Sequence, residues 1–530
     1  MPVVTETRDQ SQNPALTPDH WAEVDPDRLA VLVPDGPSMT YGELAVRSRR
    51  VAQDWSARGV LTGDRVAIAM ENRADFLVVA VAALRTSVRL VAVGTHLTAD
   101  EITHVIVDSD ARLVVTSARY LDTVCGAVHG APGAPVILVA DDDLPSSDGA
   151  DRLYGETVDP GPDATAGNLQ GAFMFYSSGT TGKPKGILRD MLDVQFAQGD
   201  PLTAGFAAMW GFTGGSVWLN SAPLYHAYPL QSCTSVVRWG GTLVLTERFD
   251  AEQTLRLIER HSVTHTSVVP TMFVRLLGLP AETRSRYDVS SLRCVIHAGA
   301  ACAVSVKQAM MTWWGPILYE FYGGSENIGM VLITPQEWLR HRGSVGKPAP
   351  GTISVRDDDG RPVAPTVRGT VWFEHAPKFS YHKSPEKTAG VFDASGRATL
   401  GDLGYLDDDG YLYLDGRRVD LIISGGVNIY PAEIEDRLAE HPAVFDVAVI
   451  GVPDHEFGQQ VKAVVELEPG VDASDELAAA LMAHTRQVLA GYKCPRSVDF
   501  ATSLPRTPTG KLLKRVLLEQ YWTTEGEGQP

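Results

Sequence analysis

Two kinds of hydrophobic pattern alternate along the first part of the chain. Short apolar runs typical of buried strands are separated by segments whose apolar residues fall on one face of a helix. The strand-like runs are 65–72, 88–94 and 111–117, and the helical segments are 74–86 and 99–110. Strands that alternate with helices favour parallel α/β layers, so we expect this fold class for the N-terminal part.

A second pattern begins after about residue 417. It predicts helices at 431–441, 475–489 and 511–521, and strands at 444–452 and 461–468. Pro431 suits the first position of its helix. These elements form an α+β unit of about 110 residues, an ordinary domain size. The sequence therefore predicts an α/β protein with a large N-terminal domain of layered α/β subdomains and a small C-terminal α+β domain.

Composition narrows the class of protein. The 530 residues carry a net charge of −19, which disfavours nucleic acid and anionic membrane as partners. The five cysteines form no CxxC pair, so neither a structural zinc site nor a disulfide framework is expected. The polar N-terminal segment does not resemble a secretory signal, and the longest apolar stretch, 76–84, is too short to span a bilayer. These features predict a cytoplasmic protein without a transmembrane segment.

A loop rich in small residues offers the first sign of chemistry. YSSGTTGKPKG (176–186) follows the apolar run GAFMF, as a loop that leaves a strand does. Successive backbone N–H groups and hydroxyls of such a loop can cradle an anion, and Lys183 and Lys185 add positive charge. The kinase-type phosphate loop needs a longer spacing between its glycines than this loop has. Taken alone, the loop is equally consistent with a flexible surface segment.

Four further segments accompany this loop: HAGAA (297–301), YEFYGGSEN (319–327), the stretch 401–435, and PRTPTGKLLKR (505–515). Together they resemble the adenylate-forming (AMP-binding) superfamily, and its acyl-CoA synthetase branch in particular. The resemblance runs from TYGEL (40–44) to residue 515. It implies an AMP-forming acid–thiol ligase of lipid metabolism that uses ATP, Mg²⁺ and coenzyme A.

The resemblance also implies roles for individual residues. Lys511, Glu326 and His226 are the expected catalytic residues, and Glu326 is the expected magnesium ligand. A hard carboxylate oxygen suits Mg²⁺, which would neutralise charge on phosphate. The expected ATP- and AMP-binding residues are Ser177, Ser178, Gly179, Thr180, Thr181, Gly182, Lys185, Gly299, Ala300, Ala301, Glu320, Phe321, Tyr322, Gly323, Ser325, Asp402 and Arg417. Within this set, one carboxylate, that of Asp402, suits two ribose hydroxyls, and Arg417 suits an anionic nucleotide.

Three further expectations concern the thiol, the acid and the domains. Ser424, Gly425 and Gly426 would border the pantetheine channel, although a tight turn between two strands explains them as well. The expected acyl-pocket residues are His226, Tyr228, Ala298 and Gly324. The resemblance places a hinge at Asp420, between an N-terminal adenylation domain (1–419) and a mobile C-terminal domain (420–530) that carries Lys511.

The acid is less defined by the sequence. LYHAYPL (224–230) has no carboxylate to pair an α-ammonium group, which disfavours an α-amino acid. The aromatic segment 206–218 lines an acyl pocket or belongs to the ordinary core. Residues 379–389 resemble bacterial acyl-CoA synthetases, some of which take bulky sterol or terpenoid acids instead of simple fatty acids. We therefore expect a hydrophobic acid, with fatty, terpenoid and sterol-type acids as candidates. A ligase that loads a carrier protein, a non-catalytic acyl or nucleotide sensor, and a homodimer all stay open.

Overall fold

The computed structural model describes most of the chain. The described residues are 17–34, 36–129, 133–141, 150–153, 168–177, 184–198, 201–424, 427–455, 457–507 and 510–522. Contacts divide the chain into two compact units: Met1–Ser267 with Lys378–Thr388, and Val268–Pro377 with Ala389–Pro530. This division does not coincide with the domain boundary predicted at residue 420. The predicted domains and hinge stay predictions.

The first unit holds an eight-stranded sheet in the order β18-β9-β8-β4-β3-β5-β6-β7. The strands are β3 (Arg65–Ala69), β4 (Arg89–Ala92), β5 (Leu113–Thr116), β6 (Val136–Val139), β7 (Ala150–Arg152), β8 (Ala172–Ser177), β9 (Lys185–Arg189) and β18 (Phe379–Tyr381). The strands from β8 to β7 in this order are parallel, whereas β9 and β18 join antiparallel. The strands predicted at 65–72, 88–94 and 111–117 are thus confirmed as β3, β4 and β5.

The helices of this sheet follow from its sequence pattern. They are α2 (Tyr41–Ala57), α3 (Ala74–Arg85), α4 (Ala99–Asp108), η2 (Ala118–Tyr120) and α5 (Leu121–Val128). Thr98 caps α4 and pairs with Glu101 in a capping box, which satisfies two backbone donors at its start. Every residue of α3 is buried, because it is apolar around most of its circumference and contacts α2 and α7 as well as the sheet. The helices predicted at 74–86 and 99–110 are confirmed.

The first unit also contains a run of neighbouring strands in the order β12-β10-β11-β1-β2, which is part of an eight-stranded sheet. Its strands are β1 (Leu29–Leu32), β2 (Met39–Thr40), β10 (Val217–Asn220), β11 (Thr242–Leu245) and β12 (His265–Val268). The accompanying helices are α1 (Pro18–Val24), η3 (Phe196–Gln198), α6 (Pro201–Trp210), α7 (Ala227–Arg238) and α8 (Ala251–His261). Phe212 packs against Trp218 and His265, with ring centroids 5.2 and 4.9 Å away, so this part of the aromatic segment 206–218 forms core.

The second unit begins with three neighbouring strands: β13 (Cys294–His297) runs parallel to β14 (Leu318–Gly323), which pairs antiparallel with β15 (Met330–Ile333). Its helices here are α9 (Pro270–Leu277), α10 (Ala281–Arg286), α11 (Val304–Trp314) and α12 (Pro335–Arg340). An antiparallel sheet follows in the order β16-β17-β19-β20. Its strands are β16 (Ile353–Arg356), β17 (Gly369–Phe373), β19 (Asp402–Leu406) and β20 (Leu412–Arg417); α13 (Pro385–Ala389) lies between β18 and β19 in the chain.

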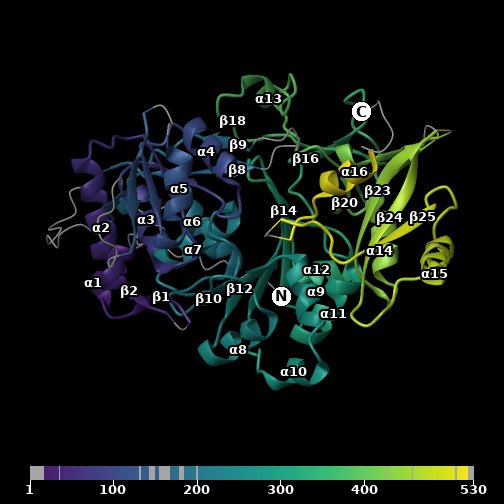
Figure 1. The fold of residues 1–530 in the computed structure, drawn as a ribbon, viewed down its shortest axis with the longest axis horizontal. Coiled ribbons are helices and arrows are strands. Elements are labelled where there is room, and N and C mark those ends of the chain that lie inside the picture. Colours follow the sequence, from purple (N-terminus) through teal and green to yellow (C-terminus); the bar gives the residue numbers. More distant parts are fainter. Residues whose placement is uncertain are drawn as a thin grey trace. The chain divides into compact units, whose positions relative to one another are not determined.

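The last part of the second unit is the predicted α+β segment. It comprises η4 (Arg418–Asp420), β21 (Ile422–Ser424), β22 (Val427–Ile429), α14 (Pro431–Ala439), β23 (Val444–Asp454), β24 (Gly458–Leu467), α15 (Asp475–Arg486), β25 (Ser497–Ala501) and α16 (Lys514–Trp522). Figure 1 shows β23 and β24 as long paired strands beside β25. Successive residues of β23 face opposite sides: Val447 and Val449 join the core that contains α14, whereas Ala448 and Ile450 join the core that contains α16.

The predicted start of the last helix is wrong. The helix expected at 511–521 begins only at Lys514. Thr507 donates its N–H to the carbonyl of Lys511 and accepts the N–H of Lys511 on its hydroxyl, and Arg506 pairs with Leu512 as a β-bridge. These bonds occupy the backbone groups that a helix would use, so Lys511 lies in a turn.

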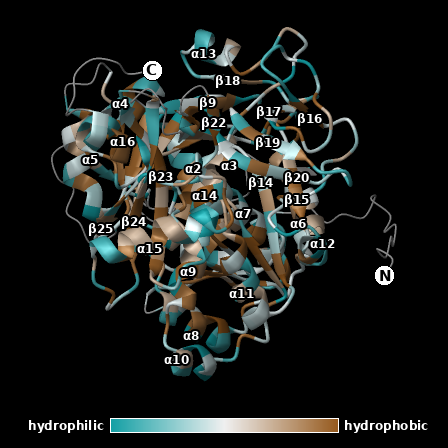
Figure 2. Ribbon diagram, turned by 90° about the vertical axis from the view of Figure 1, so that its right-hand side faces the viewer, coloured by the Kyte–Doolittle hydropathy of each residue, from teal (hydrophilic) through white to brown (hydrophobic). Residues whose placement is uncertain are grey.

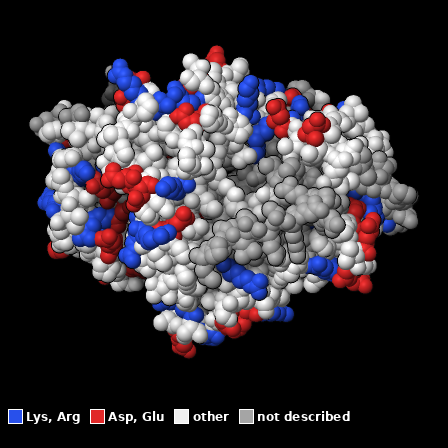
Figure 3. All heavy atoms as spheres, turned by 180° about the vertical axis from the view of Figure 1, so that it is seen from behind, with Lys and Arg blue, Asp and Glu red and all other residues white. Residues whose placement is uncertain are grey.

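Side-chain polarity agrees with this layering. Figure 2 shows hydrophobic segments concentrated in the strands and hydrophilic segments on the outer parts of helices. Acidic and basic side chains are interspersed on the face shown in Figure 3. Over the described ranges, no helix combines the length and the apolar character that crossing a membrane requires.

Candidate active site

Tyr322 and Asp402 form the centre of a polar cluster in the second unit. Tyr322 lies near the end of β14 and Asp402 begins β19, and the Tyr322 hydroxyl donates to Asp402 Oδ2 at 2.7 Å. The Tyr322 ring also stacks on Phe373, with centroids 6.0 Å apart and planes at 26°. Burial, together with the neighbouring carboxylate of Asp402, raises the pKa of Tyr322 well above its ordinary value. The phenol therefore stays a hydrogen-bond donor.

Arg417 lies directly opposite Asp402 across the antiparallel pair β19–β20. Its Nε is 3.7 Å from Asp402 Oδ1, and its side chain is 41% exposed, so it can still reach a ligand. Burial raises the pKa of Asp402, against the effects of the Tyr322 hydrogen bond, Arg417 and Lys511. A partly desolvated carboxylate beside an arginine is suited to accept hydroxyl hydrogen bonds.

Lys511, in the C-terminal segment, interacts electrostatically with Asp402 and Arg417. Burial and Arg417 lower its pKa, whereas Asp402, Asp420 and Glu326 oppose that shift. The turn that carries it is anchored at both ends. Arg506 donates two bonds to Asp446, at 2.8 and 2.7 Å, and one to the carbonyl of Gly510 at 2.5 Å. Gly510 itself has a φ of +77°, and a Cβ there would lie 2.1 Å from Thr271 Oγ1. Only glycine fits this close approach.

Glu326 lies in the turn after β14. Its Oε2 would be only 2.6 Å from a Cβ at Gly324, so the carboxylate lies over that glycine. Asn327 closes the turn with a φ of +56° and donates its N–H to the carbonyl of Gly324. The described parts of the chain contain no group of three or more His, Cys, Asp or Glu residues that could hold a metal ion. The role of Glu326 as a Mg²⁺ ligand stays a prediction.

The side chain of Glu320 points into a buried ion pair. Its Oε2 accepts from Lys307 Nζ at 2.6 Å, and the side chains of Lys307 and Glu320 are 1% and 10% exposed. His297 Nε2 is 3.5 Å from the same oxygen. Burial and Lys307 lower the pKa of His297 well below its ordinary value, which keeps the imidazole neutral. Glu320 was expected to bind nucleotide; its side chain contacts Lys307, and a role in nucleotide binding stays a prediction.

The other nucleotide-binding residues expected in this unit lie on loops and strand ends. Ser325 and Gly323 are exposed, Gly299 has a φ of +87°, and Phe321 lies between Glu320 and Tyr322 on β14. The sites expected at Ala298, Ala300 and Ala301 belong to the loop that follows β13. The nucleotide-binding role of these positions stays a prediction.

The loop expected to bind an anion belongs to the first unit. Ser178, Gly179, Thr180, Thr181 and Gly182 lie outside the described residues, as does the side chain of Ser177. The flanking strands are described: Ser177 pairs with Lys185 across β8 and β9, so the loop connects adjacent antiparallel strands. Lys185 Nζ lies 5.4 Å from the ring centroid of Tyr381.

His226 is the residue before α7 in the first unit. Its Nε2 is buried and finds no hydrogen-bond partner among the described residues. Burial and the nearby His96 lower the pKa of His226 to about 4, so the ring is neutral at physiological pH. Tyr228 lies in the first turn of the same helix, and its ring centroid is 5.7 Å from that of Phe206. The two expected acyl-pocket residues of this unit thus lie at the start of one helix, beside an aromatic cluster.

Ser424 ends β21 and pairs with Val427 of β22. Gly425 and Gly426, which connect these strands, lie outside the described residues. Asp420 ends η4, and burial raises its pKa against the effect of Lys514. The turn interpretation and the channel interpretation of 424–426 are therefore compatible.

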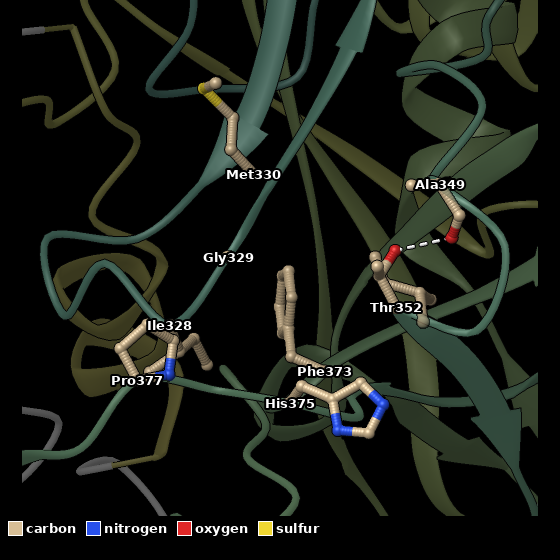
Figure 4. A pocket seen from close by; sticks show the side chains of 9 residues that line it. Ile328, Gly329, Met330, Ala349, Thr352, Phe373, His375 and Pro377 are labelled. Atoms are coloured by element: carbon tan, nitrogen blue, oxygen red, sulfur yellow. Dashed lines mark hydrogen bonds between the residues drawn. The ribbon is translucent and has the colours of Figure 1, made fainter. Parts of the chain in front are cut away.

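A cavity of about 220 Å³ opens behind Phe373, within the second unit. It is lined by Ile328, Gly329, Met330, Ala349, Thr352, Ile353, Phe373, His375 and Pro377. In Figure 4 the Phe373 ring stands in the centre, with Ile328 and Pro377 on one side and Thr352, bonded to the carbonyl of Ala349 at 2.7 Å, on the other. Phe373 and Thr271 were not among the residues predicted from the sequence. Neither lies in one of the five quoted motifs, and their contacts with Tyr322 and Gly510 arise only on folding.

Comparisons with known proteins agree with one family. The family model described as "AMP-binding enzyme" matches residues 18–377, and that described as "AMP-binding enzyme C-terminal domain" matches 433–511. The chain is 30% identical over 498 residues to 2-succinylbenzoate–CoA ligase of Bacillus licheniformis, covering 94% of this chain and 98% of that protein. It is 32% identical over 507 residues to the long-chain-fatty-acid–CoA ligase FadD13 of Mycobacterium tuberculosis, covering 92% and 94%.

The chain is also similar to a ligase that uses a carrier protein and to a CoA synthetase whose structure contains an acyl-adenylate. The fatty acid–[acyl-carrier-protein] ligase ScoC of Streptomyces coeruleorubidus is 31% identical over 521 residues, with 97% of each chain covered. Among solved structures, o-succinylbenzoate CoA synthetase of Bacillus subtilis in complex with its acyl-adenylate intermediate has a TM-score of 0.77 and 29% identity. That comparison covers 95% of this chain and 98% of that one.

Proposed function

Because the chain belongs to the family of AMP-binding enzymes, we propose that it is an acid–thiol ligase that converts a carboxylic acid to an acyl-adenylate and then to a thioester with coenzyme A. The observation that carries this proposal is the convergence of Tyr322, Asp402, Arg417 and Lys511 around one point in the second unit. These groups come from β14, from the β19–β20 pair and from the C-terminal segment.

In the first half-reaction the substrate carboxylate attacks the α-phosphorus of ATP, and the bond to pyrophosphate breaks. Asp402 accepts the ribose hydroxyls, and the Tyr322 ring, backed by Phe373, lies against the adenine. Arg417 and Lys511 place two positive charges where negative charge moves toward pyrophosphate. Lys511 serves as a charge and not as a base, because its ammonium form is the one that stabilises developing anions.

Magnesium supplies the neutralisation of phosphate charge in this chemistry when it is bound. Glu326 is the protein residue that would hold it. The loop 176–186 offers backbone and hydroxyl donors for the β- and γ-phosphates.

In the second half-reaction a thiol attacks the acyl carbonyl, the thioester forms, and AMP leaves. The proton of the thiol passes to solvent or to the phosphate of AMP. We propose that residues 420–530 rotate about Asp420 between the two half-reactions, which removes Lys511 and brings Ser424, Gly425 and Gly426 toward the pantetheine arm.

The acid that we propose is hydrophobic. Names of relatives support both fatty acids and an aromatic acid, and the aromatic cluster beside His226 and Tyr228 is apolar. A neutral His226 carries no positive charge that would favour a second carboxylate at that point. Bulky terpenoid and sterol-type acids belong to the same class. Transfer to a carrier protein is the second candidate, because ScoC is similar over nearly its whole length.

The test is pyrophosphate release from ATP and Mg²⁺ with a panel of short, long, aryl and polycyclic acids, with and without coenzyme A. The expected result is release that depends on one acid class, with AMP and an acyl-CoA as products. Pyrophosphate and AMP without a thioester would favour a carrier-protein acceptor. No release with any acid would refute the ligase proposal, and acid-independent ADP would identify a different ATPase.

A further inference from the structure

We propose that Arg368 and Tyr430 form a latch that keeps the C-terminal segment in the arrangement with Lys511 beside Asp402. The latch favours acid activation over thioester formation. The inference rests on the proposed function and adds a positioning pair to it.

Arg368 precedes β17, and two of its contacts are with residues that, like Arg368 itself, come before residue 420 in the chain. Its Nε donates to Asp415 Oδ2 at 2.9 Å, and Asp415 lies on β20 with its side chain 10% exposed. Its guanidinium carbon also lies 5.5 Å from the ring centroid of Tyr405 on β19. These two contacts fix the guanidinium on the sheet that carries Asp402 and Arg417.

A third contact crosses to the other side of residue 420. The same guanidinium carbon lies 5.0 Å from the ring centroid of Tyr430, the residue before the first turn of α14. An arginine over an aromatic face is attracted by the ring quadrupole, whose face is electrostatically negative, and the attraction grows where water is partly excluded. Helix α14 contacts β20 as well, so the contact belongs to a packed interface.

Charges on α14 complete the interface. Glu433, in the first turn of α14, accepts from Lys493 Nζ at 3.0 and 2.7 Å. Burial raises the pKa of Asp415 together with Glu433, whereas Arg368 and Lys493 oppose that rise. A rotation of residues 420–530 would separate Tyr430, Glu433 and Lys493 from Arg368 and Asp415. The interface therefore stabilises one of the two arrangements that the two half-reactions require.

The chain offers a matched pair of variants. Tyr430→Leu removes the contact across residue 420 and leaves the Arg368–Asp415 bond intact. Tyr405→Leu removes an aromatic contact with the same guanidinium on its own side of residue 420, so it controls for the loss of a ring. Neither tyrosine belongs to the proposed catalytic or binding residues.

Two half-reactions are measured for each variant. ATP–pyrophosphate exchange with the acid identified by the panel reports activation, and single-turnover conversion of the supplied acyl-adenylate with coenzyme A reports thioester formation. For Tyr430→Leu we expect exchange to fall about twofold to fivefold, with the second half-reaction unchanged or faster. Tyr405→Leu should change the rate of neither half-reaction. An equal fall in both half-reactions, or the same shift in Tyr405→Leu, would overturn the latch.

A second readout needs no acid. Acetylation of Lys511 by acetic anhydride, measured by mass spectrometry against Lys347 as an internal reference, reports how accessible the Lys511 side chain is. Tyr430→Leu should raise the relative rate for Lys511, and an unchanged rate would contradict the proposal. Absence of exchange in the parent protein with every acid would refute the proposed function, while this labelling would still test the latch.

Discussion

Replacing Gly510 by alanine tests how the turn places Lys511. The glycine has a φ of +77°, and an added Cβ would lie 2.1 Å from Thr271 Oγ1 and 3.1 Å from Thr271 Cβ. The turn cannot keep its position with such a contact, because atoms at this distance overlap strongly. We expect Gly510→Ala to move Lys511 away from Asp402 while the rest of the fold stays intact.

The magnitude follows from two contributions. A left-handed backbone costs alanine about 1–2 kcal/mol relative to glycine. Overpacking of a filled contact costs about 1–3 kcal/mol more. Even the lower sum, about 2 kcal/mol, corresponds to about a thirtyfold fall in the population with Lys511 in place. ATP–pyrophosphate exchange should therefore fall at least about thirtyfold, while the affinity for ATP changes little.

Two controls separate the contributions. Gly470 has a φ of +87° and no heavy atom within 4 Å of an added Cβ, so Gly470→Ala carries the backbone cost without the collision. It should leave exchange near the parent value. Adding Thr271→Ala to Gly510→Ala removes the nearest oxygen and should restore part of the exchange rate. Parent-level exchange in Gly510→Ala, or a double variant no better than the single one, would refute the reasoning.

Three other variants test the rest of the site. Lys511→Ala should lower adenylate formation by about 10²-fold or more yet keep ATP affinity in calorimetry, because its charge acts mainly in the transition state; normal activation would contradict this role. Burial raises the pKa of Asp402, so the carboxylate takes up a proton at a higher pH than usual, and AMP affinity should fall as the pH drops through that value. Tyr322→Phe removes a donor to the carboxylate and should move this midpoint to higher pH, and an unmoved midpoint would show that the hydrogen bond is unimportant. Lys307→Met leaves Glu320 buried without its cation and should lower the free energy of unfolding by about 3–5 kcal/mol at neutral pH. The loss should shrink at lower pH, because a folded-state pKa raised above the unfolded value favours the protonated folded form; chemical denaturation at two pH values measures both.

Local pattern was sufficient for most of the elements that were predicted from it. The strand β3 and the helices α3 and α14 follow from apolar period and from a proline at a helix start, which are properties of neighbouring residues. The start of α16 was not predictable in this way. The three residues before Lys514 were predicted to be helical. They are held instead by bonds from Thr507 and by the bridge between Arg506 and Leu512, which compete with helix formation.

Side-chain direction was less predictable than residue identity. Glu320 belongs to a nucleotide-binding motif, but its side chain turns to Lys307 on α11, because strand residues point alternately to opposite faces. Phe373 belongs to none of the quoted motifs, yet it stacks on Tyr322. Neither fact can be read from spacing along the chain.

The sequence by itself determined the chemistry that this protein has available. Its motifs are contiguous stretches, such as 176–186 and 505–515, and their residue types follow directly from the order of the chain. Tertiary structure decided which of these groups meet. The Tyr322–Asp402 bond joins residues 80 positions apart, and the turn that carries Lys511 depends on space left beside Thr271. Such contacts depend on how strands pair and how segments pack, and packing distances are set by the whole fold and not by any one segment.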